Sequence, residues 1–248
     1  MDINISLKPI AYAWKHALNS YNGQLTKEKY PITAEAIEFY VFKNKTDTAY
    51  IAVYEDHVVF AFRGTENLKG WLSDLDVYPL KNEQYMKKNL KDGKWGRGTI
   101  HDGLYTGWLF FKSCIDTWIN SCDIEKLSKL PIITTGHSRG GGFAELCSRH
   151  LAKNRSISSS CFTFGAPSVG TKRYRDQFRL LPINGTRVVN GWDMVTFLPP
   201  KALGFTHGCA NLVWNKKALW KRFIPWSRME DHKSKNYNKY ITKRFING

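Results

Sequence analysis

The segment that most constrains this chain is residues 131–146, which read PIITTGHSRGGGFAEL. Its β-branched start predicts a short strand, and the residues after the glycines predict a helix with small side chains in its first turn. The turn between them, residues 136–140, is a G-x-S-x-G sequence, in which the serine adopts a strained backbone conformation that exposes its hydroxyl. Ser138 is therefore a candidate nucleophile, with a structural Gly/Ser turn as the alternative.

The glycines of this segment have a mechanical role in the same prediction. Gly136 and Gly140 to Gly142 carry no Cβ, so the strand and the helix can pass close together. The N-terminus of the helix would direct its positive dipole at an oxyanion formed beside Ser138.

A nucleophilic serine of this kind is followed along the chain by an acid and then by a histidine. Residues 186–200, TRVVNGWDMVTFLPP, predict a strand followed by Asp193, which is the candidate acid; a turn or capping aspartate is the alternative. Two histidines compete for the role of base. His232 is preferred because it heads a predicted C-terminal helix, where a loop can present its imidazole, whereas His207 precedes a predicted strand.

The remaining histidines and the cysteines indicate no cofactor. The other five histidines show no pairing with Cys, Asp or Glu at metal-ligand spacing, so we expect structural or surface roles and neither a metal ion nor another cofactor. The five cysteines are an odd number without a C-x-x-C pair. This usage favours buried free thiols and a reducing compartment.

Length and composition favour one large domain, residues 1–248. The chain is 42% hydrophobic and 14% aromatic, which is enough to bury a sizeable core, and no linker or repeat divides it. No stretch is apolar and long enough to cross a membrane, and the first residues lack the apolar core of a secretory signal. We expect a cytoplasmic protein, or one exported without a Sec signal.

Hydrophobic periodicity predicts further elements before the G-x-S-x-G turn at residues 136–140, which we call the elbow. A helix is expected over Pro9–Ser20, and strands are expected from Ile37, Ala49 and Val58, the last as a near-continuous apolar run that suits a covered sheet. A long amphipathic helix is expected over Asp102–Asn120.

At these residues the sequence resembles the class 3 lipases, the fungal triacylglycerol lipase type that includes phospholipases A1 and diacylglycerol lipases. The resemblance covers about Ile37–Tyr240 and follows the family order: VVFAFRGT with GWLSDL, HDGLYTGW, TTGHSRGGGFAEL, CFTFGAPSVG, RVVNGWDMVTFLPP, FTHG and DHKSKNYNKYI. It implies an α/β-hydrolase fold, with a predominantly parallel central sheet covered by helices and a lid segment.

The resemblance also implies roles for individual residues. Ser138 would be the nucleophile, Asp193 the orienting acid and His232, in an Asp-His-x-x-x-x-Tyr-like setting, the base. Thr65, the hydroxyl residue after Arg-Gly, and the backbone N–H of Arg139 would form the oxyanion hole. Such a site cleaves esters by two-step acyl transfer.

The match leaves three points open. Asp74 would hold Thr65 or Arg63 in place, with a surface aspartate as the alternative. Arg139 stands where the family usually has leucine, and its guanidinium would either attract a phosphate or acidic head group or remain solvated. The segment in which the lid of such lipases begins is cationic, because residues 81–97 hold six Lys or Arg against two acidic residues.

The net charge of +16 is concentrated in residues 81–97 and 216–248. The second block interleaves Trp and Phe with Lys and Arg, a composition typical of segments that dock on an anionic membrane surface. A solvated charged face and nucleic-acid binding are the alternatives, and no nucleic-acid motif supports the latter. The expected partners are a lipid ester substrate and an anionic membrane, not nucleic acid.

These observations favour a membrane glycerophospholipid as substrate, cleaved by an A1-type phospholipase that associates peripherally with membranes. A toxin-like phospholipase is a bolder form of the same hypothesis. The alternative within the class is a neutral mono-, di- or triacylglycerol lipase. The alternative from another class is a non-catalytic basic protein that binds membranes or nucleic acid on a hydrolase fold.

Overall fold

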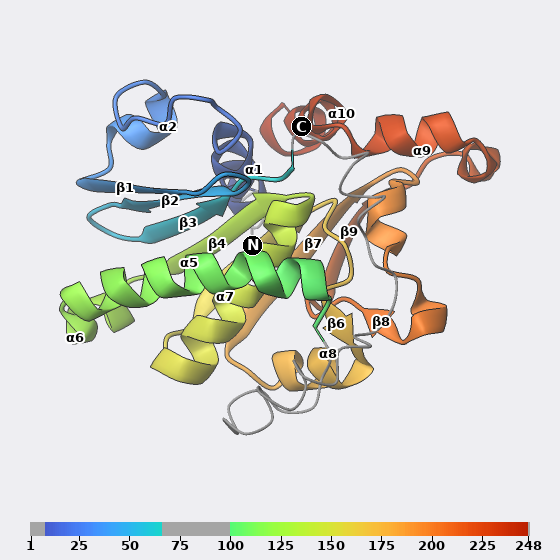
Figure 1. Cartoon of the computed structure of the whole chain (residues 1–248). Helices are drawn as coiled ribbons and strands as arrows, with labels where there is room; N and C mark the ends of the chain where they lie inside the picture. The colour runs from blue at the N-terminus through green and yellow to red at the C-terminus, as the bar shows by residue number, and fades with distance from the viewer. Residues whose placement is uncertain (1–7, 66–99, 248) are drawn as a thin grey trace, which may run out of the picture.

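The computed structural model describes residues 8–65 and 100–247, which surround a seven-stranded sheet (Figure 1). The strand order is β1-β2-β3-β4-β5-β7-β9. The first three strands pair antiparallel, and every pair from β3 to β9 is parallel. The strands are β1 (Glu38–Lys43), β2 (Thr48–Val53), β3 (Val58–Phe62), β4 (Ile132–His137), β5 (Ser159–Phe164), β7 (Ile183–Asn190) and β9 (Asn211–Asn215).

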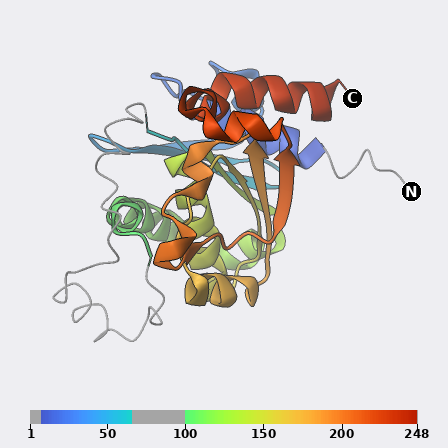
Figure 2. The same ribbon diagram turned by 90° about the vertical axis from the view of Figure 1, so that its right-hand side faces the viewer.

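Helices cover both faces of this sheet, as a predominantly parallel sheet requires (Figures 1 and 2). One face is covered by α5 (Asp102–Ser121) and α7 (Arg139–Arg155), and the other by α1 (Lys8–Asn19) and α10 (Ser234–Ile241). The shorter elements are α2 (Pro31–Ala34), α6 (Ile124–Lys129), β6 (Gly170–Thr171), α8 (Lys172–Arg179), η1 (Met194–Phe197), η2 (Lys201–Leu203), β8 (Phe205–Thr206), η3 (Leu219–Phe223), α9 (Pro225–His232) and η4 (Thr242–Ile246).

Strand β3 shows why a continuous apolar run is needed at the centre of the sheet. Val58, Phe60 and Phe62 pack into the cluster that contains the apolar residues of α5 and α7. Val59 and Ala61 point to the opposite face and pack with β2. Because successive side chains of a strand alternate between faces, both sets are apolar only when both faces are buried.

Helix α5 packs on the sheet through one apolar stripe. Leu104, Trp108, Phe111, Ile115 and Trp118 recur at helical spacing, and each is at most 6% exposed. Burying a side chain of this size contributes roughly 1.5–3 kcal/mol. The stripe therefore anchors α5 against α7, the helix that begins at the elbow.

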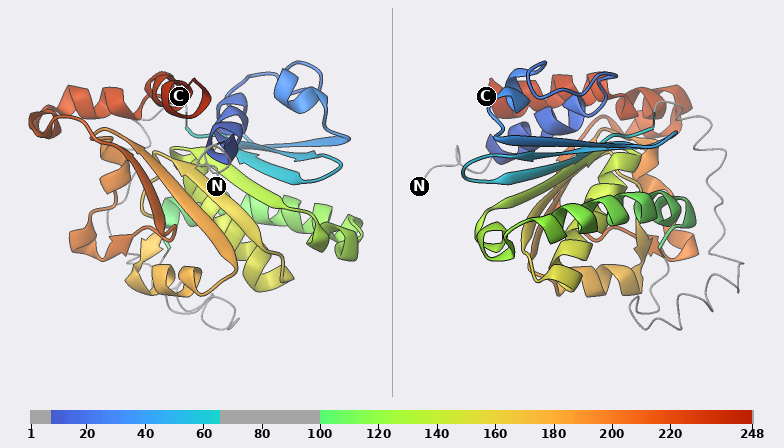
Figure 3. Two further views of the ribbon diagram at one scale, coloured as in Figure 1. Left: turned by 180° about the vertical axis from the view of Figure 1, so that it is seen from behind. Right: turned by 60° about the vertical axis from the view of Figure 1, so that its left-hand side comes forward.

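The terminal helices lie side by side on the other face, as Figure 3 shows from behind. Trp14 of α1 donates its indole N–H to Asn238 of α10 at 2.9 Å. The ring of Trp14 also packs at 5.8 Å from that of Tyr237. Segments at opposite ends of the chain thus form one layer, which supports the C-terminal end of the site.

The elements expected before the elbow are confirmed, with shifts of one or two residues at their ends. The expected C-terminal arrangement is wrong in one respect: His232 ends α9 instead of heading a helix, and α10 begins at Ser234. All five cysteines lie in the described part of the chain and are free thiols. Among the described helices, none combines the length and apolarity that a membrane crossing needs.

Candidate active site

The turn between β4 and α7 holds Ser138 in a conformation that few residues other than glycine adopt. Its φ is 58° and its ψ is −132°. A non-glycine residue at positive φ is strained, and such strain is typical of functional turns. The Ser138 N–H donates to the Phe164 carbonyl of β5 at 2.8 Å, which helps to hold the turn in place.

The glycines on either side of Ser138 are required by close backbone packing. A Cβ on Gly136 would lie 2.3 Å from the carbonyl oxygen of Gly140. A Cβ on Gly140 would lie 2.2 Å from the carbonyl oxygen of Phe62 at the end of β3. Neither contact can be relieved by moving a side chain, since both neighbours are backbone atoms. The predicted mechanical role of the glycines is confirmed.

Three predicted residues meet in a buried chain of hydrogen bonds. The Nε2 of His232 lies 2.9 Å from the Ser138 hydroxyl oxygen. The Nδ1 of His232 lies 2.9 Å from both carboxylate oxygens of Asp193. Because a carboxylate only accepts hydrogen bonds, Nδ1 carries the proton and Nε2 is free to accept from Ser138. This arrangement can take a proton from the serine hydroxyl.

Additional donors fix the carboxylate of Asp193. The backbone N–H of Val195 donates to Oδ1 at 2.9 Å, because Asp193 caps the 3-10 helix η1. The hydroxyl of Tyr237 on α10 donates to Oδ2 at 2.7 Å. Asp193 therefore both caps η1 and contacts His232. The two interpretations offered for Asp193 from the sequence are thus compatible.

Of the predicted oxyanion-hole residues, Arg139 follows Ser138 directly, and Thr65 follows a glycine that packs against Ser138. Arg139 is the first residue of α7, so its backbone N–H lies among the donors at the helix N-terminus that have no partner within the helix. Thr65 follows Gly64, and a Cβ on Gly64 would lie 3.1 Å from the Cβ of Ser138. Asp74 lies outside the described residues.

The part of the sequence that contains Ser138 and Asp193 matches a known protein family. Residues 59–203, more than half of the chain, match the family model described as Lipase (class 3). The chain belongs to the class 3 lipase family.

Two relatives within this family bear different names. Rhizomucor miehei lipase is 28% identical over 161 residues, which cover 62% of this chain and 40% of the relative. Phospholipase A1-Igamma2, chloroplastic, of Arabidopsis thaliana is 39% identical over 194 residues, which cover 63% of this chain and 35% of the relative. The match spans less than half the length of either relative.

Solved structures of lipases share the fold. Rhizomucor miehei triacylglyceride lipase superposes with a TM-score of 0.73 at 20% identity, covering 93% of this chain and 94% of the other. Lipase II from Rhizopus niveus gives a TM-score of 0.71 at 18% identity, covering 93% and 94%. At these identities the likeness shows the α/β-hydrolase fold, which confirms the fold expected from the sequence.

The guanidinium of Arg139 is held by contacts within the protein. Its Nη1 forms an ion pair with Asp47 at 2.5 Å, and its Nη2 donates to the Gly103 carbonyl at 3.1 Å. It also lies 4.9 Å above the ring of Phe143. The side chain is thus engaged by the β1–β2 loop and α5 and is only 14% exposed, so it is not a freely solvated side chain.

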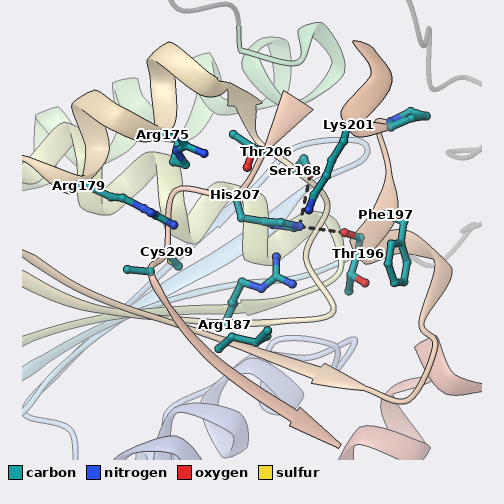
Figure 4. Close-up of a pocket in the computed structure, with 13 residues that line it drawn as sticks. Ser168, Arg175, Arg179, Arg187, Thr196, Phe197, Lys201, Thr206, His207 and Cys209 are labelled. Carbon is teal, nitrogen blue, oxygen red and sulfur yellow. Dashed lines mark hydrogen bonds between the residues drawn. The ribbon is translucent and has the colours of Figure 1, made fainter. Parts of the chain in front are cut away.

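His207, the competing candidate for the base, lies elsewhere. Its Nε2 is 2.9 Å from the carbonyl oxygen of Thr196 and 3.4 Å from the hydroxyl oxygen of Ser168, so its ring nitrogen is used away from Ser138 (Figure 4). Burial and the nearby charge of Arg187 lower the pKa of His207 to about 3, so the ring is neutral. The choice of His232 over His207 agrees with this placement.

Two residues next to the triad, His137 and Asp231, were not identified as functional from the sequence. His137 lies between Tyr21, whose hydroxyl is 2.7 Å from Nδ1, and the backbone carbonyl of His232, which is 2.9 Å from Nε2. Burial, followed by the proximity of His232, holds the pKa of His137 well below its usual value. Asp231 accepts from the Trp192 N–H at 2.8 Å and pairs with Lys217.

Some signals for these residues were present in the sequence. His137 is inside the G-x-S-x-G motif, and Asp231 precedes the candidate base directly. The aromatic position of the Asp-His-x-x-x-x-Tyr pattern is Tyr237, the residue that contacts Asp193. Over residues 8–65 and 100–247, no group of three or more His, Cys, Asp or Glu side chains is placed to hold a metal ion.

Proposed function

We propose that this chain is a serine hydrolase of lipid carboxylic esters. The observation that carries the proposal is the hydrogen-bonded chain from Asp193 through His232 to a Ser138 held at positive φ. A structural neighbour with a TM-score of 0.70 is described as a triacylglycerol lipase whose catalytic centre is a serine protease triad. Asp193, His232 and Ser138 are connected in the acid–histidine–serine arrangement of such a triad.

The geometry supports a two-step acyl transfer. His232 takes the hydroxyl proton through Nε2 while Ser138 Oγ attacks the ester carbonyl. Asp193 stabilises the resulting imidazolium and holds its orientation through Nδ1. The backbone N–H of Arg139 and the Thr65 hydroxyl stabilise the tetrahedral oxyanion; one such donor is worth about 3–4 kcal/mol. His232 then protonates the leaving alcohol, and water cleaves the acyl-enzyme.

The substrate we propose is a membrane glycerophospholipid. An apolar ridge lies on η3 and α9, where Leu219, Trp220, Phe223 and Trp226 are 60–80% exposed. Exposed large apolar side chains in a group are typical of interaction surfaces. The surrounding block, residues 216–248, carries a net charge of +8. An apolar ridge in a cationic setting suits an anionic membrane surface.

The position of this ridge relative to the triad supports the same proposal. The helix α9 begins beside Trp226 and ends with His232. At about 1.5 Å of rise per residue, these two residues are roughly 9 Å apart along the helix axis. A ridge docked on a membrane would therefore hold the catalytic histidine close to the lipid surface. Relatives named phospholipase A1 favour a phospholipid over other esters.

A neutral glyceride lipase is the second candidate. It is favoured by the similarity to Rhizomucor miehei lipase in both sequence and fold. A non-catalytic binding protein on the same fold is disfavoured, because the serine, histidine and aspartate form one continuous hydrogen-bonded chain.

The test is fatty-acid release from vesicles of phosphatidylglycerol, phosphatidylethanolamine, phosphatidylcholine and diacylglycerol, at low and high salt. We expect release from the phospholipids that decreases with salt and disappears in Ser138→Ala. Release from diacylglycerol alone would favour the neutral lipase. Failure of the folded chain to react with a fluorophosphonate at Ser138 would favour the non-catalytic binder.

The ridge is tested separately from the chemistry. Trp226→Ser should lower activity on vesicles and leave hydrolysis of a soluble short-chain ester unchanged. Leu180→Ser is the matched control, because Leu180 is 86% exposed but lies outside the ridge, at the end of α8. Equal losses for the two variants would argue against docking through the ridge.

A further inference from the structure

A pocket of about 530 Å³ lies between α8, β7, the η1–η2 segment and the turn before β9 (Figure 4). None of the triad residues lines it. Phe197, Pro200 and Leu212 form apolar parts of its wall, and the remaining lining is mostly polar or cationic. Nothing in the proposed ester hydrolysis uses this pocket.

Four cationic side chains line the pocket, and its described lining contains no Asp or Glu. Arg175 and Arg179 are four residues apart on α8 and therefore share one face of that helix. Arg187 comes from β7, and Lys201 comes from η2. Cations from three separate elements thus converge, although like charges repel and their proximity is unfavourable without an anion.

Arg187 shows this most clearly. It extends from the middle of β7, and its Nε is buried without a hydrogen-bond partner. In the described part of the chain no carboxylate forms an ion pair with its guanidinium. A buried guanidinium nitrogen without a partner is costly, and a water, an ion or a ligand that accepts from it would remove this cost.

The other cations are only partly neutralised. Arg175 pairs with Asp176, which is exposed on the same helix and does not line the pocket, so the pair contributes little. Arg179 uses Nε to donate to the Gly208 carbonyl at 3.2 Å, which leaves its terminal nitrogens available. The carboxylate of Glu145 accepts from the Gly208 N–H at 3.1 Å and is not part of the pocket wall.

The pKa of His207 is lowered in part by the positive charges around the pocket. Figure 4 shows the side chains of Arg187 and Lys201 reaching toward the His207 ring. Burial comes first among the causes that lower the pKa of His207 to about 3, and the charges of Arg187 and then Lys201 add to it. A neutral ring donates to Thr196 and does not add to the charge. It leaves the arginines and the lysine as the groups that an anion would meet.

We propose that this pocket binds a phosphoryl group, with Arg187 and Lys201 as its principal contacts and Arg179 and Arg175 completing the site from α8. Guanidinium forks match the oxygens of a phosphate in pairs, and a lysine ammonium adds a point charge. The pocket is roomier than a bare phosphate needs, and its apolar wall at Phe197 and Leu212 suits a phosphate ester. The phosphoryl group belongs either to a lipid head group or to a soluble phosphate ester.

The first experiment titrates the full chain with inorganic phosphate, against sodium chloride of equal ionic strength, and measures binding by calorimetry. We expect saturable binding to the wild type, with a Kd that rises about tenfold or more in Arg187→Gln and in Lys201→Gln. Arg173→Gln is the matched control, because Arg173 is exposed on α8 and does not line the pocket. Its Kd should equal that of the wild type.

Two outcomes would overturn the proposal. One is a wild-type response to phosphate that chloride reproduces, and the other is a loss in Arg173→Gln as large as in the pocket variants. Should Arg187→Gln fail to fold, Lys201→Gln and Arg179→Gln decide the matter, since both residues are exposed. Their melting temperatures show whether the fold is intact.

The second experiment distinguishes the two sources of the phosphoryl group. It uses Ser138→Ala, which cannot turn over lipid, with glycerol 3-phosphate and with phosphatidylglycerol vesicles. A head-group site predicts that adding Lys201→Gln weakens vesicle binding, and a site for soluble esters predicts that it weakens only glycerol 3-phosphate binding. Binding of both ligands unaffected by Lys201→Gln and by Arg187→Gln would refute the pocket. Because the readout is binding, this result is independent of whether the chain hydrolyses esters.

Discussion

The imidazole of His137 stacks on that of His232, with ring centroids 4.8 Å apart and an interplanar angle of 28°. The two residues are also bonded, since Nε2 of His137 lies 2.9 Å from the backbone carbonyl oxygen of His232. The variable position of the elbow motif therefore holds the end of α9, on which the candidate base is carried. His137 is a positioning residue, because it contacts the base and not the reacting atoms.

His137→Phe should lower kcat by about tenfold to a hundredfold and leave KM for a soluble ester nearly unchanged. The ring volume is retained, but the His232 carbonyl and the Tyr21 hydroxyl each lose a partner. The measurement is steady-state kinetics together with urea unfolding. Tyr21→Phe is the control, because it removes the bond to Nδ1 and keeps the bond to His232. An unchanged kcat in His137→Phe would exclude the positioning role.

The ion pair between Arg139 and Asp47 should behave as a coupled unit. Asp47 is 5% exposed, so Asp47→Ala leaves a buried guanidinium unpaired and should lower the free energy of unfolding by about 3–5 kcal/mol. The double variant Asp47→Ala with Arg139→Leu should recover most of this loss, since neither charge remains. Denaturant unfolding of the four proteins in this cycle provides the measurement. Losses that simply add in the double variant would show that the two residues are not coupled.

Activity gives an independent readout of the same cycle. Arg139→Leu retains the backbone N–H that we propose stabilises the oxyanion, so the double variant should keep kcat within a few-fold of the wild type. A loss of several orders of magnitude in the folded double variant would mean that the guanidinium itself acts in the reaction.

The elbow geometry predicts a stability gain at the expense of function. Ser138 is held at φ 58°, where a side chain is strained and glycine is not. The free energy of unfolding of Ser138→Gly should therefore exceed that of Ser138→Ala by about 1 kcal/mol. This figure allows for the greater entropy of glycine in the unfolded chain. Both variants should lose nearly all activity. Lower stability of Ser138→Gly would argue that the turn is not strained.

Sequence reasoning located the triad because each member obeys a local rule. Ser138 is marked by the glycines that the turn requires, and Asp193 follows a strand that ends at the same edge of the sheet as β4. The order of serine, acid and histidine then left two candidates for the base. Hydrophobic periodicity was equally sufficient for the α5 stripe and for β3, where burial follows directly from spacing.

The contacts that sequence reasoning missed are all between distant segments. Asp47 and Arg139 are 92 residues apart, and no local pattern shows that the β1–β2 loop reaches the elbow. The end of α9 at His232 was missed because no Pro or Gly marks it. The helix ends there because Lys233 has extended backbone angles. The preceding Asp231 accepts hydrogen bonds from the Trp192 N–H and from the Asn190 side chain. Tertiary contacts, and not helix propensity, set that boundary.

A buried carboxyl on α7 predicts how the stability of the fold depends on pH. Burial raises the pKa of Glu145 to about 7, against an ordinary value near 4.5. Between these two pH values the folded chain holds a proton that the unfolded chain releases, so the free energy of unfolding falls as the pH rises. The contribution levels off above about pH 7 and amounts to roughly 3 kcal/mol at most. Glu145→Gln removes this titration while keeping an acceptor for the Gly208 N–H.

The expected result is therefore a difference curve. The stability of Glu145→Gln relative to the wild type should increase from pH 4.5 to 7 and stay constant above, as measured by urea unfolding at a series of pH values. Taking the difference cancels the contributions of other groups, including the buried neutral His16 and His207, whose lowered pKa values destabilise the fold below about pH 6.5. Glu55→Gln is the matched control for the substitution itself, because Glu55 is exposed. A flat curve for Glu145→Gln would mean that Glu145 ionises in the folded chain at its ordinary pH.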